Sequence, residues 1–182
     1  MPAPSEIRRL APADAADYRE VRLAALKDDP EAFSSRYGIE AARPDEDFAA
    51  RLQTSVVHAA YREGRIVGMA GVAARSDPVE PRCAFLWGVY VRPEMRGLGI
   101  ASRMLDAALE KALERFDEIT LDVAAGNLPA IALYEKFGFA RRGMPRPMQT
   151  GAGDRDEISM VKFLGAADTR EPGARAMRTP DK

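Results

Sequence analysis

The chain has 182 residues, of which 46% are hydrophobic and 30% are charged, a composition typical of a globular protein rather than of a disordered or fibrous one. The 27 Lys and Arg residues nearly balance the 28 Asp and Glu residues, and the formal net charge of -1 argues against a general nucleic-acid-binding surface. A single cysteine, Cys83, and a single histidine, His58, exclude an internal disulfide framework and a Cys/His zinc site.

The first half of the sequence predicts one strand, then two or three helices, then a β-hairpin. A short strand is expected at Glu6–Leu10. The helix after it has apolar positions at Tyr18, Val21, Leu23, Ala25 and Leu26. Another helix is expected at Pro44–Gln53, because Pro suits a first helical turn and Phe48 and Leu52 are four residues apart. Residues 55–75 then read as two strands joined at Glu63-Gly64.

The second half alternates strands and helices. The continuous apolar run Cys83–Val91 predicts a central strand that is covered on both faces. The next helix carries one apolar stripe, made of Ala101, Met104, Leu105, Ala108, Leu109, Ala112 and Phe116. A strand at 118–125, a helix at 127–138 closed by Gly138, and strands at 139–143 and 156–164 follow. Residues 165–182 contain Gly, Pro and charge but few large apolar side chains, so we expect a disordered tail after a domain spanning 1–164.

Two glycines, Gly97 and Gly99, lie where the central strand passes into the helix, in the stretch "VRPEMRGLGIASRML". The first amides of a helix have no partners within the helix, and glycine lets the backbone approach a ligand closely. The helix dipole adds partial positive charge, and Arg96 can add a full one. The segment Met95–Ser102 is therefore a candidate site for a diphosphate.

Other interpretations of this corner have to be weighed. A purely structural turn would use the same two glycines. The dinucleotide-binding fingerprint requires a third glycine, three residues after Gly99, which this chain lacks, and the P-loop requires Gly-Lys-Ser/Thr, which is also absent. Neither nucleotide motif therefore fits the segment.

The segment "RGLGIA", Arg96 to Ala101, resembles the acetyl-CoA signature Arg/Gln-x-x-Gly-x-Gly/Ala of the GNAT superfamily of N-acetyltransferases. The segment "NLPAIALYEKFGF", Asn127 to Phe139, is similar to the Asn-x-x-Ala-x-x-x-Tyr-x-x-x-Gly-Phe segment of the same family. The resemblance covers roughly Ile7 to Leu164. It implies an α+β fold, a GNAT-like mixed and mostly antiparallel twisted sheet of about six to seven strands flanked by helices.

The resemblance also implies an activity and a set of cofactor contacts. The protein is expected to move an acetyl group from acetyl-CoA to a primary amine by direct attack in a ternary complex. The main chain of Val89, Tyr90 and Val91 would pair with the pantetheine arm as an added strand. The pyrophosphate would lie against the amides of Met95, Arg96, Gly97, Leu98, Gly99, Ile100, Ala101 and Ser102. Asn127 would hydrogen-bond the cofactor, although it is also a good helix N-cap.

Two residues are candidates for the chemistry. By the resemblance, Tyr134 would give a proton to the departing thiolate; alternatively it belongs to a core stripe with Ala130, Leu133 and Phe137. Some relatives carry a glutamate as general base on the strand before the signature loop, but residues 83–87 contain no carboxylate. Others place an acid five positions before the Asn, where this chain has Asp122. A solvated Asp122, Glu80, a water relay and His58 remain the alternatives.

The acceptor is the least readable part of the sequence. Its contacts are expected from the helices before residue 55 and from the loop 144–157, with Phe33, Tyr37 and Trp87 as candidate lining or core residues. Arg141, Arg142 and Arg146 would attract an acidic acceptor or form a solvated face.

We expect an amine-bearing small molecule, peptide or protein as partner, and a cytoplasmic protein with no metal, nucleic acid or membrane partner. A homodimer through an exposed sheet edge or through the last strands is also expected. The alternative is a catalytically silent GNAT-like module that binds CoA as a sensor or serves protein interactions.

Overall fold

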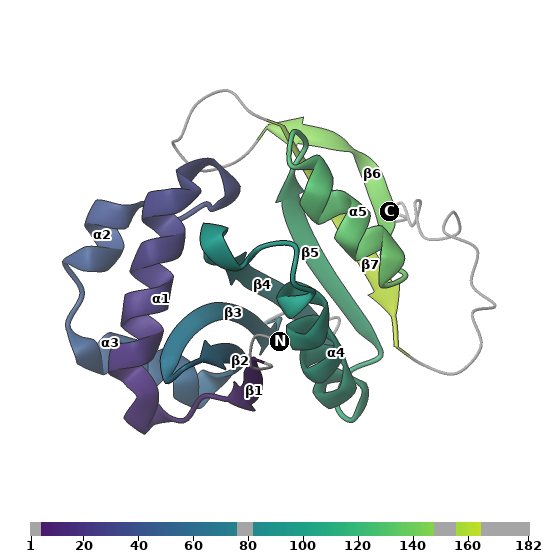
Figure 1. Cartoon of the computed structure of the whole chain (residues 1–182). Coiled ribbons are helices and arrows are strands. Elements are labelled where there is room, and N and C mark those ends of the chain that lie inside the picture. Colours follow the sequence, from purple (N-terminus) through teal and green to yellow (C-terminus); the bar gives the residue numbers. More distant parts are fainter. Residues whose placement is uncertain (1–4, 76–81, 148–155, 165–182) are drawn as a thin grey trace, which may run out of the picture.

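The computed structural model describes residues 5–75, 82–147 and 156–164, which form one sheet with helices on its faces (Figure 1). The strands are β1 (Glu6–Arg9), β2 (Ser55–Arg62), β3 (Arg65–Ala74), β4 (Cys83–Val91), β5 (Glu118–Ala124), β6 (Ala140–Pro147) and β7 (Asp156–Phe163). The helices are α1 (Ala15–Asp28), α2 (Tyr37–Ala41), α3 (Asp45–Thr54), α4 (Ile100–Leu113) and α5 (Leu128–Lys136). Short 3₁₀ turns lie at Pro12–Asp14, Pro30–Ala32 and Pro93–Met95.

The seven strands have the order β1-β2-β3-β4-β5-β7-β6. The pair β4–β5 is parallel and every other neighbouring pair is antiparallel. This confirms the expected α+β class, the mixed and mostly antiparallel sheet, and the strand count. The hairpin turn at Glu63-Gly64 is confirmed as well, since both residues have positive φ, as a two-residue hairpin loop requires.

The end of β6 differs from the prediction. Strand β6 continues to Pro147, so Arg146 and Pro147, which were expected in the loop 144–157, pair with β7 instead. The extension needs an irregular step between Arg142 and Arg146, and Gly143 there has φ +74°. The remainder of that loop, Glu80 and the predicted tail lie outside the described residues.

The helices cover both faces of the first four strands (Figure 1). On one face α1 and α3 contribute Tyr18, Val21 and Phe48 to a cluster with β2 and β3. On the opposite face α4 packs Ile100 and Met104 against β2 and β3. The rest of the α4 stripe joins α5 over β5 and β7 in a third cluster. The predicted stripe of α4 is therefore its core-facing side. On α1 the predicted stripe is confirmed except at Leu23, which is only partly buried and lies in none of the three clusters.

The centre of the sheet is split between β4 and β5. The two strands pair only at Cys83–Phe85 against Glu118–Thr120, and beyond that they diverge (Figure 1). Just after the paired segment β4 has a bulge, because three steps along β4 from Trp87 to Tyr90 face two steps along β3. Gly88 lies inside the bulge with φ +66°, a conformation that disfavours any residue with a Cβ. The prediction of a central strand is confirmed by the strand order, but the C-terminal half of β4 has a free edge.

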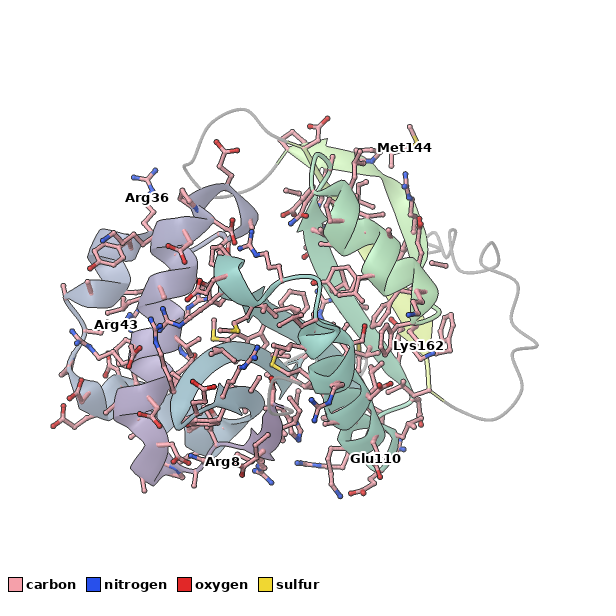
Figure 2. The ribbon with its side chains drawn as sticks, viewed as in Figure 1. Arg8, Arg36, Arg43, Glu110, Met144 and Lys162 are labelled. Atoms are coloured by element: carbon pink, nitrogen blue, oxygen red, sulfur yellow. The ribbon has the colours of Figure 1, made fainter. Side chains whose placement is uncertain are left out.

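The far edge of the sheet is exposed. All eight residues of β6 are exposed to solvent, and Met144, 86% exposed, points away from the body of the molecule (Figure 2). Across the described ranges, no helix is both long enough and apolar enough to cross a bilayer.

Candidate functional site

The corner between β4 and α4 is shaped by its two glycines. Gly97 and Gly99 have φ of +77° and +72°, and Gly99 is the N-cap of α4. The first helical hydrogen bond runs from the Arg103 amide to the Gly99 carbonyl at 3.2 Å. The amides of residues 97–102 donate to no acceptor among the described residues. Six unpaired donors at the positive end of a helix favour a bound anion.

Two of the predicted amides are already engaged. The Met95 amide donates to the Arg92 carbonyl at 2.8 Å, and the Arg96 amide donates to the Pro93 carbonyl at 3.2 Å. The Arg96 side chain is also held, since its Nε donates to the Val91 carbonyl at 3.0 Å and its other end pairs with Asp29. The donors available for an anion therefore narrow to residues 97–102, and the charge of Arg96 is shared with a carboxylate.

The free edge of β4 points towards the split. The Arg92 amide donates to Val67 on β3, so alternation along the strand turns the amide and carbonyl of Val89 and Val91 to the opposite side. Beyond Phe85 no described strand pairs with that side of β4. The Val89 amide and carbonyl and the Val91 amide can therefore bond an extended ligand. By the same alternation, the amide and carbonyl of Tyr90 face β3, where this residue pairs with Met69. The side-chain hydroxyl of Tyr90 donates a hydrogen bond to Asp28, and burial raises the pKa of this phenol.

These features border one long depression, which we call the main groove, with a volume of about 1230 Å³. Its lining comes from five places in the chain: residues 28–33, residues 89–91, residues 95–102 except Leu98, eight residues between Ala124 and Tyr134, and Asp156. Among the described lining residues the acids outnumber the bases, with Asp28, Asp29, Glu31 and Asp156 against Arg96. An anion bound there would therefore depend on backbone amides rather than on side-chain charge.

Leu98 lies at the corner without lining the groove. Its side chain is 53% exposed and turns to solvent, so of this residue only the backbone amide can serve the groove.

Asn127 lies on the β5 side of the main groove and does cap a helix. Its Oδ1 accepts a hydrogen bond from the Ala130 amide at 3.3 Å, at the start of α5. This confirms the N-cap interpretation. The amide nitrogen of the side chain forms no hydrogen bond with a described residue, and so it remains a donor for a ligand in the groove.

Tyr134 projects from α5 into the main groove with only 8% of its surface exposed. Its ring packs edge-on against Phe139 at 5.9 Å, and its hydroxyl forms no hydrogen bond within the described residues. Burial raises the pKa of the phenol, so it stays protonated at neutral pH. The ring therefore belongs to the core, as one interpretation of the sequence predicted, and the residue lines the groove, whereas its role in the chemistry stays a prediction.

A second depression, the side cavity, is lined by residues of both β4 and β5 and has a volume of about 420 Å³. It shares Ala32, Phe33 and Ala124 with the main groove, so the two meet there. The bulge divides β4 between them: residues 85–88 line the side cavity and residues 89–91 line the main groove.

Asp122 lines the side cavity and not the main groove. It accepts a hydrogen bond from Ser159 at 2.6 Å and forms an ion pair with Arg146 at 2.9 Å. Arg146 also pairs with Glu157 at 2.8 Å. The structure therefore places the two predicted catalytic side chains, Tyr134 and Asp122, in adjoining cavities rather than in one.

Only some of the aromatic and basic residues that were predicted to contact the acceptor line the side cavity. Phe33 and Trp87 line the side cavity, whereas Tyr37 is 46% exposed and lies outside it. Of the three arginines, Arg146 lines the side cavity, while Arg141 and Arg142 pair with Glu135 and Glu118 at the surface.

Arg22 was not predicted from the sequence, although it lines the side cavity and is only 6% exposed. The signal was present, because position 22 falls on the buried stripe of α1, four residues from Tyr18 and from Leu26. An arginine inside an apolar stripe is buried only with partners or for a function.

His58, on β2, lines neither cavity, and burial lowers its pKa. Within the described ranges, His, Cys, Asp and Glu form no group of three or more that could hold a metal ion.

Comparisons with known proteins bear on this arrangement. The family model described as the Acetyltransferase (GNAT) family matches residues 21–139. YjgM of Escherichia coli (strain K12), named an uncharacterized N-acetyltransferase, is 33% identical over 116 residues, which cover 58% of this chain and 69% of that protein. Human N-acetyltransferase 8 is 33% identical over 86 residues, and the match spans 46% of this chain and 38% of the human protein. The structure of yncA from Salmonella typhimurium with its cofactor acetyl-CoA has a TM-score of 0.77 at 18% identity, covering 93% of this chain and 99% of that one.

Proposed function

The chain belongs to the GNAT family of acetyltransferases, and on this premise we propose that it transfers an acetyl group from acetyl-CoA to a primary amine by direct attack in a ternary complex. The observation that carries the proposal is the meeting of the main groove with the side cavity where β4 leaves β5. A thioester in the groove and an amine in the cavity would touch there. Such contact alone can contribute about 7–11 kcal/mol to lowering the barrier.

The main groove suits acetyl-CoA in its shape and in its donors. The amides of residues 97–102 would bond the pyrophosphate, and the free edge of β4 at Val89 and Val91 would pair with the amides of the pantetheine arm. The amide nitrogen of Asn127 would bond the same arm from the β5 side. The yncA structure supports this choice of cofactor through a related fold.

Acetyl-CoA supplies the acetyl group as an activated thioester. The Val89 amide would stabilise negative charge that develops on the acyl oxygen. As the amine nitrogen forms its bond to the acyl carbon, the carbon–sulfur bond breaks, and the Tyr134 hydroxyl gives its proton to the sulfur. The buried phenol suits this step, because its raised pKa keeps the proton available at neutral pH.

The incoming amine has to lose a proton. Asp122 is our candidate base because it is a carboxylate that lines the cavity through which the amine would enter. It would act directly or through one water, and the Ser159 and Arg146 contacts would hold the carboxylate in place.

The first test is binding of acetyl-CoA, measured as a thermal shift. A ligand at about 100 times its Kd adds roughly 2.7 kcal/mol, which is several degrees for a domain of this size. Gly99→Glu, which puts a carboxylate at the unpaired amides, should abolish the shift. Gly64→Glu is the matched control: φ there is +75°, an added Cβ also meets no atom within 4 Å, and the residue lies in the hairpin turn away from the groove.

The second test is release of free thiol from acetyl-CoA in the presence of amines. Release with any amine supports an enzyme. Binding of acetyl-CoA without release, over a broad panel of small amines, amino acids and peptides, would favour the silent sensor or interaction module. A wild-type protein without a thermal shift would contradict both.

The proposal includes three further expectations. The family domain spans residues 1–164, the protein acts in the cytoplasm, and it forms a homodimer through the exposed edge strand β6. Light scattering after gel filtration measures the mass in solution, and Met144→Lys should shift a dimer to monomer.

A further inference from the structure

The side cavity contains a buried guanidinium with an unmet hydrogen bond. Arg22 is 6% exposed, and its Nε has no hydrogen-bond partner in the described part of the chain. Two aromatic rings lie against the group, Phe33 at 5.3 Å and Trp87 at 6.0 Å from its central carbon. The N–H bonds of a guanidinium lie in its plane, so its hydrogen bonds form along its edges.

The positive charge around Arg22 is only partly neutralised. Its acidic partner Glu40 lies 3.5 Å away, a long ion pair. Both oxygens of that carboxylate accept hydrogen bonds from Arg51, the shorter at 3.1 Å. Two guanidiniums thus share one carboxylate, all at least partly buried. Burial without a full counter-charge is costly, and accordingly the pKa of Arg22 is lowered, mainly by desolvation.

The remaining charges of the side cavity are satisfied by each other or by solvent. Arg146 pairs with both Asp122 and Glu157. Arg75 is exposed and donates to the Thr120 hydroxyl at 3.2 Å. Among the described residues of the cavity, Arg22 is therefore the cation that an incoming anion would complete. A planar carboxylate matches the edge of a guanidinium with two parallel hydrogen bonds.

The position of Phe33 limits how far this anion lies from the reacting amine. Phe33 packs on Arg22 and is also one of the residues at which the side cavity meets the main groove. The distance between a carboxylate bound at Arg22 and the place where the two cavities meet would thus be about the width of one aromatic ring. The reacting amine must lie at that meeting place. The amine and the carboxylate of the acceptor are then separated by only a few bonds, and a cavity of about 420 Å³ holds a small molecule of that kind.

We propose that the acceptor is a free amino acid, whose carboxylate is bound by Arg22 in the side cavity and whose amine receives the acetyl group. The proposal rests on the proposed function and names its substrate class. A peptide N-terminus differs at the decisive point, because a neutral amide replaces the carboxylate next to the amine.

The test compares each of the 20 amino acids with its own carboxamide. Calorimetric titration into the wild-type protein saturated with CoA measures binding without turnover, and thiol release with acetyl-CoA measures transfer. At least one acid should bind about 10- to 100-fold more tightly than its amide, as expected for a lost charge-assisted interaction. Equal binding of acid and amide, or no binding of any member of the panel, would overturn the proposal.

Arg22→Gln should reduce the preference for acid over amide to within about twofold. Arg51→Gln is the matched control, because it removes the other guanidinium from Glu40 but lines neither cavity, and it should keep the preference. Loss of the preference in both variants would assign the effect to folding of the cluster and contradict the role of Arg22. Should Arg22→Gln not fold, the wild-type comparison decides alone, with Arg22→Lys, which keeps the charge but not the planar fork, expected to give an intermediate preference.

The two proposals fail in different ways. Thiol release with amines that lack a carboxylate, at the same efficiency as with amino acids, would leave the acetyltransferase intact and remove the amino-acid proposal. Tight binding of an amino acid with no thiol release would keep the Arg22 site and remove the acetyltransferase.

Discussion

The main groove and the side cavity are built from different parts of the polypeptide. At the groove, the ligand-facing donors are backbone amides of residues 97–102 and of β4, and the charged side chains are mostly acidic. In the side cavity, side chains from α1, β5, β6 and β7, together with Ser34 and Arg75, supply the polar groups, and β4 contributes mainly apolar ones. A backbone site depends on conformation and tolerates varied side chains, whereas a side-chain site changes with each substitution. One fold can therefore keep its cofactor and vary its acceptor.

Tyr134 is the exception in the groove, because it contributes through its side chain, and it gives the largest expected effect. Tyr134→Phe should lower kcat about 100-fold, the low end of general acid catalysis, because a thiolate is already a fair leaving group. The Kd for acetyl-CoA should stay within about twofold. Stability should not fall, since the lost hydroxyl has no partner among the described residues. Stopped-flow thiol release, calorimetry and urea unfolding measure the three quantities.

An unchanged kcat would place Tyr134 with the core residues, through its contact with Phe139. Phe139→Leu is a useful control, because it loosens the ring without removing the hydroxyl and should lower stability more than kcat.

Asp122 tests the side cavity alone. Asp122→Asn should lower kcat/KM for the amine about tenfold, less than full base catalysis can give, because Ser159 and Arg146 already engage the carboxylate. The loss should shrink as pH rises towards the pKa of the amine, where the substrate deprotonates without help. Steady-state kinetics of both proteins from about pH 7 to about pH 10 would show how the ratio of their kcat/KM values changes with pH.

The Kd for acetyl-CoA should not change in Asp122→Asn, because Asp122 does not line the main groove. A parallel loss of cofactor binding would contradict the separation of the two regions. Ser159→Ala, which leaves the carboxylate but removes its hydrogen bond, should cost less than Asp122→Asn.

The difference between the two regions also explains which of them the sequence predicted. The corner at Gly97 and Gly99 is local: strand, glycines and helix are contiguous, and the positive φ that only glycine tolerates well leaves a pattern in the sequence. The strands and helices were predictable for the same reason, since periodicity is local too. The corrections within this corner, the engaged amides of Met95 and Arg96, depend on a 3₁₀ turn that no residue pattern marked.

The side cavity was hardly predictable, because it is assembled from distant segments. Arg22 meets Phe33 and Trp87 only after α1 packs on the sheet. The split that opens the cavity follows from the loss of pairing between β4 and β5 beyond Phe85, and Cys83–Val91 reads as one uniform apolar run. Gly88 was the available signal, since a glycine inside a strand pattern often marks a bulge.

A third prediction sharpens the statement that the groove works through its backbone. Leu98→Ala should change the Kd for acetyl-CoA by less than about twofold, because the side chain faces solvent. Ala101→Pro should weaken binding about tenfold, the loss of one charge-assisted hydrogen bond. Its amide has no partner in α4, and proline is tolerated in a first helical turn, so the helix should persist. Calorimetry gives both constants, and equal effects of the two variants would contradict a backbone site.

The smallest effect concerns His58, which belongs to neither region and so reports on the sheet alone. Burial, then the nearby Arg9 and Lys111, lower its pKa below the ordinary 6.5. Below pH 6.5 the unfolded chain therefore binds a proton that the folded chain binds less readily, and the free energy of unfolding falls as the pH drops from 6.5 towards the folded-state pKa. His58→Gln should reduce this dependence between about pH 7 and 5 in urea unfolding. If acid lowered the stability of both proteins equally, other groups would cause the loss; if it lowered the activity of both equally with stability unchanged, the pH dependence would lie in the two cavities.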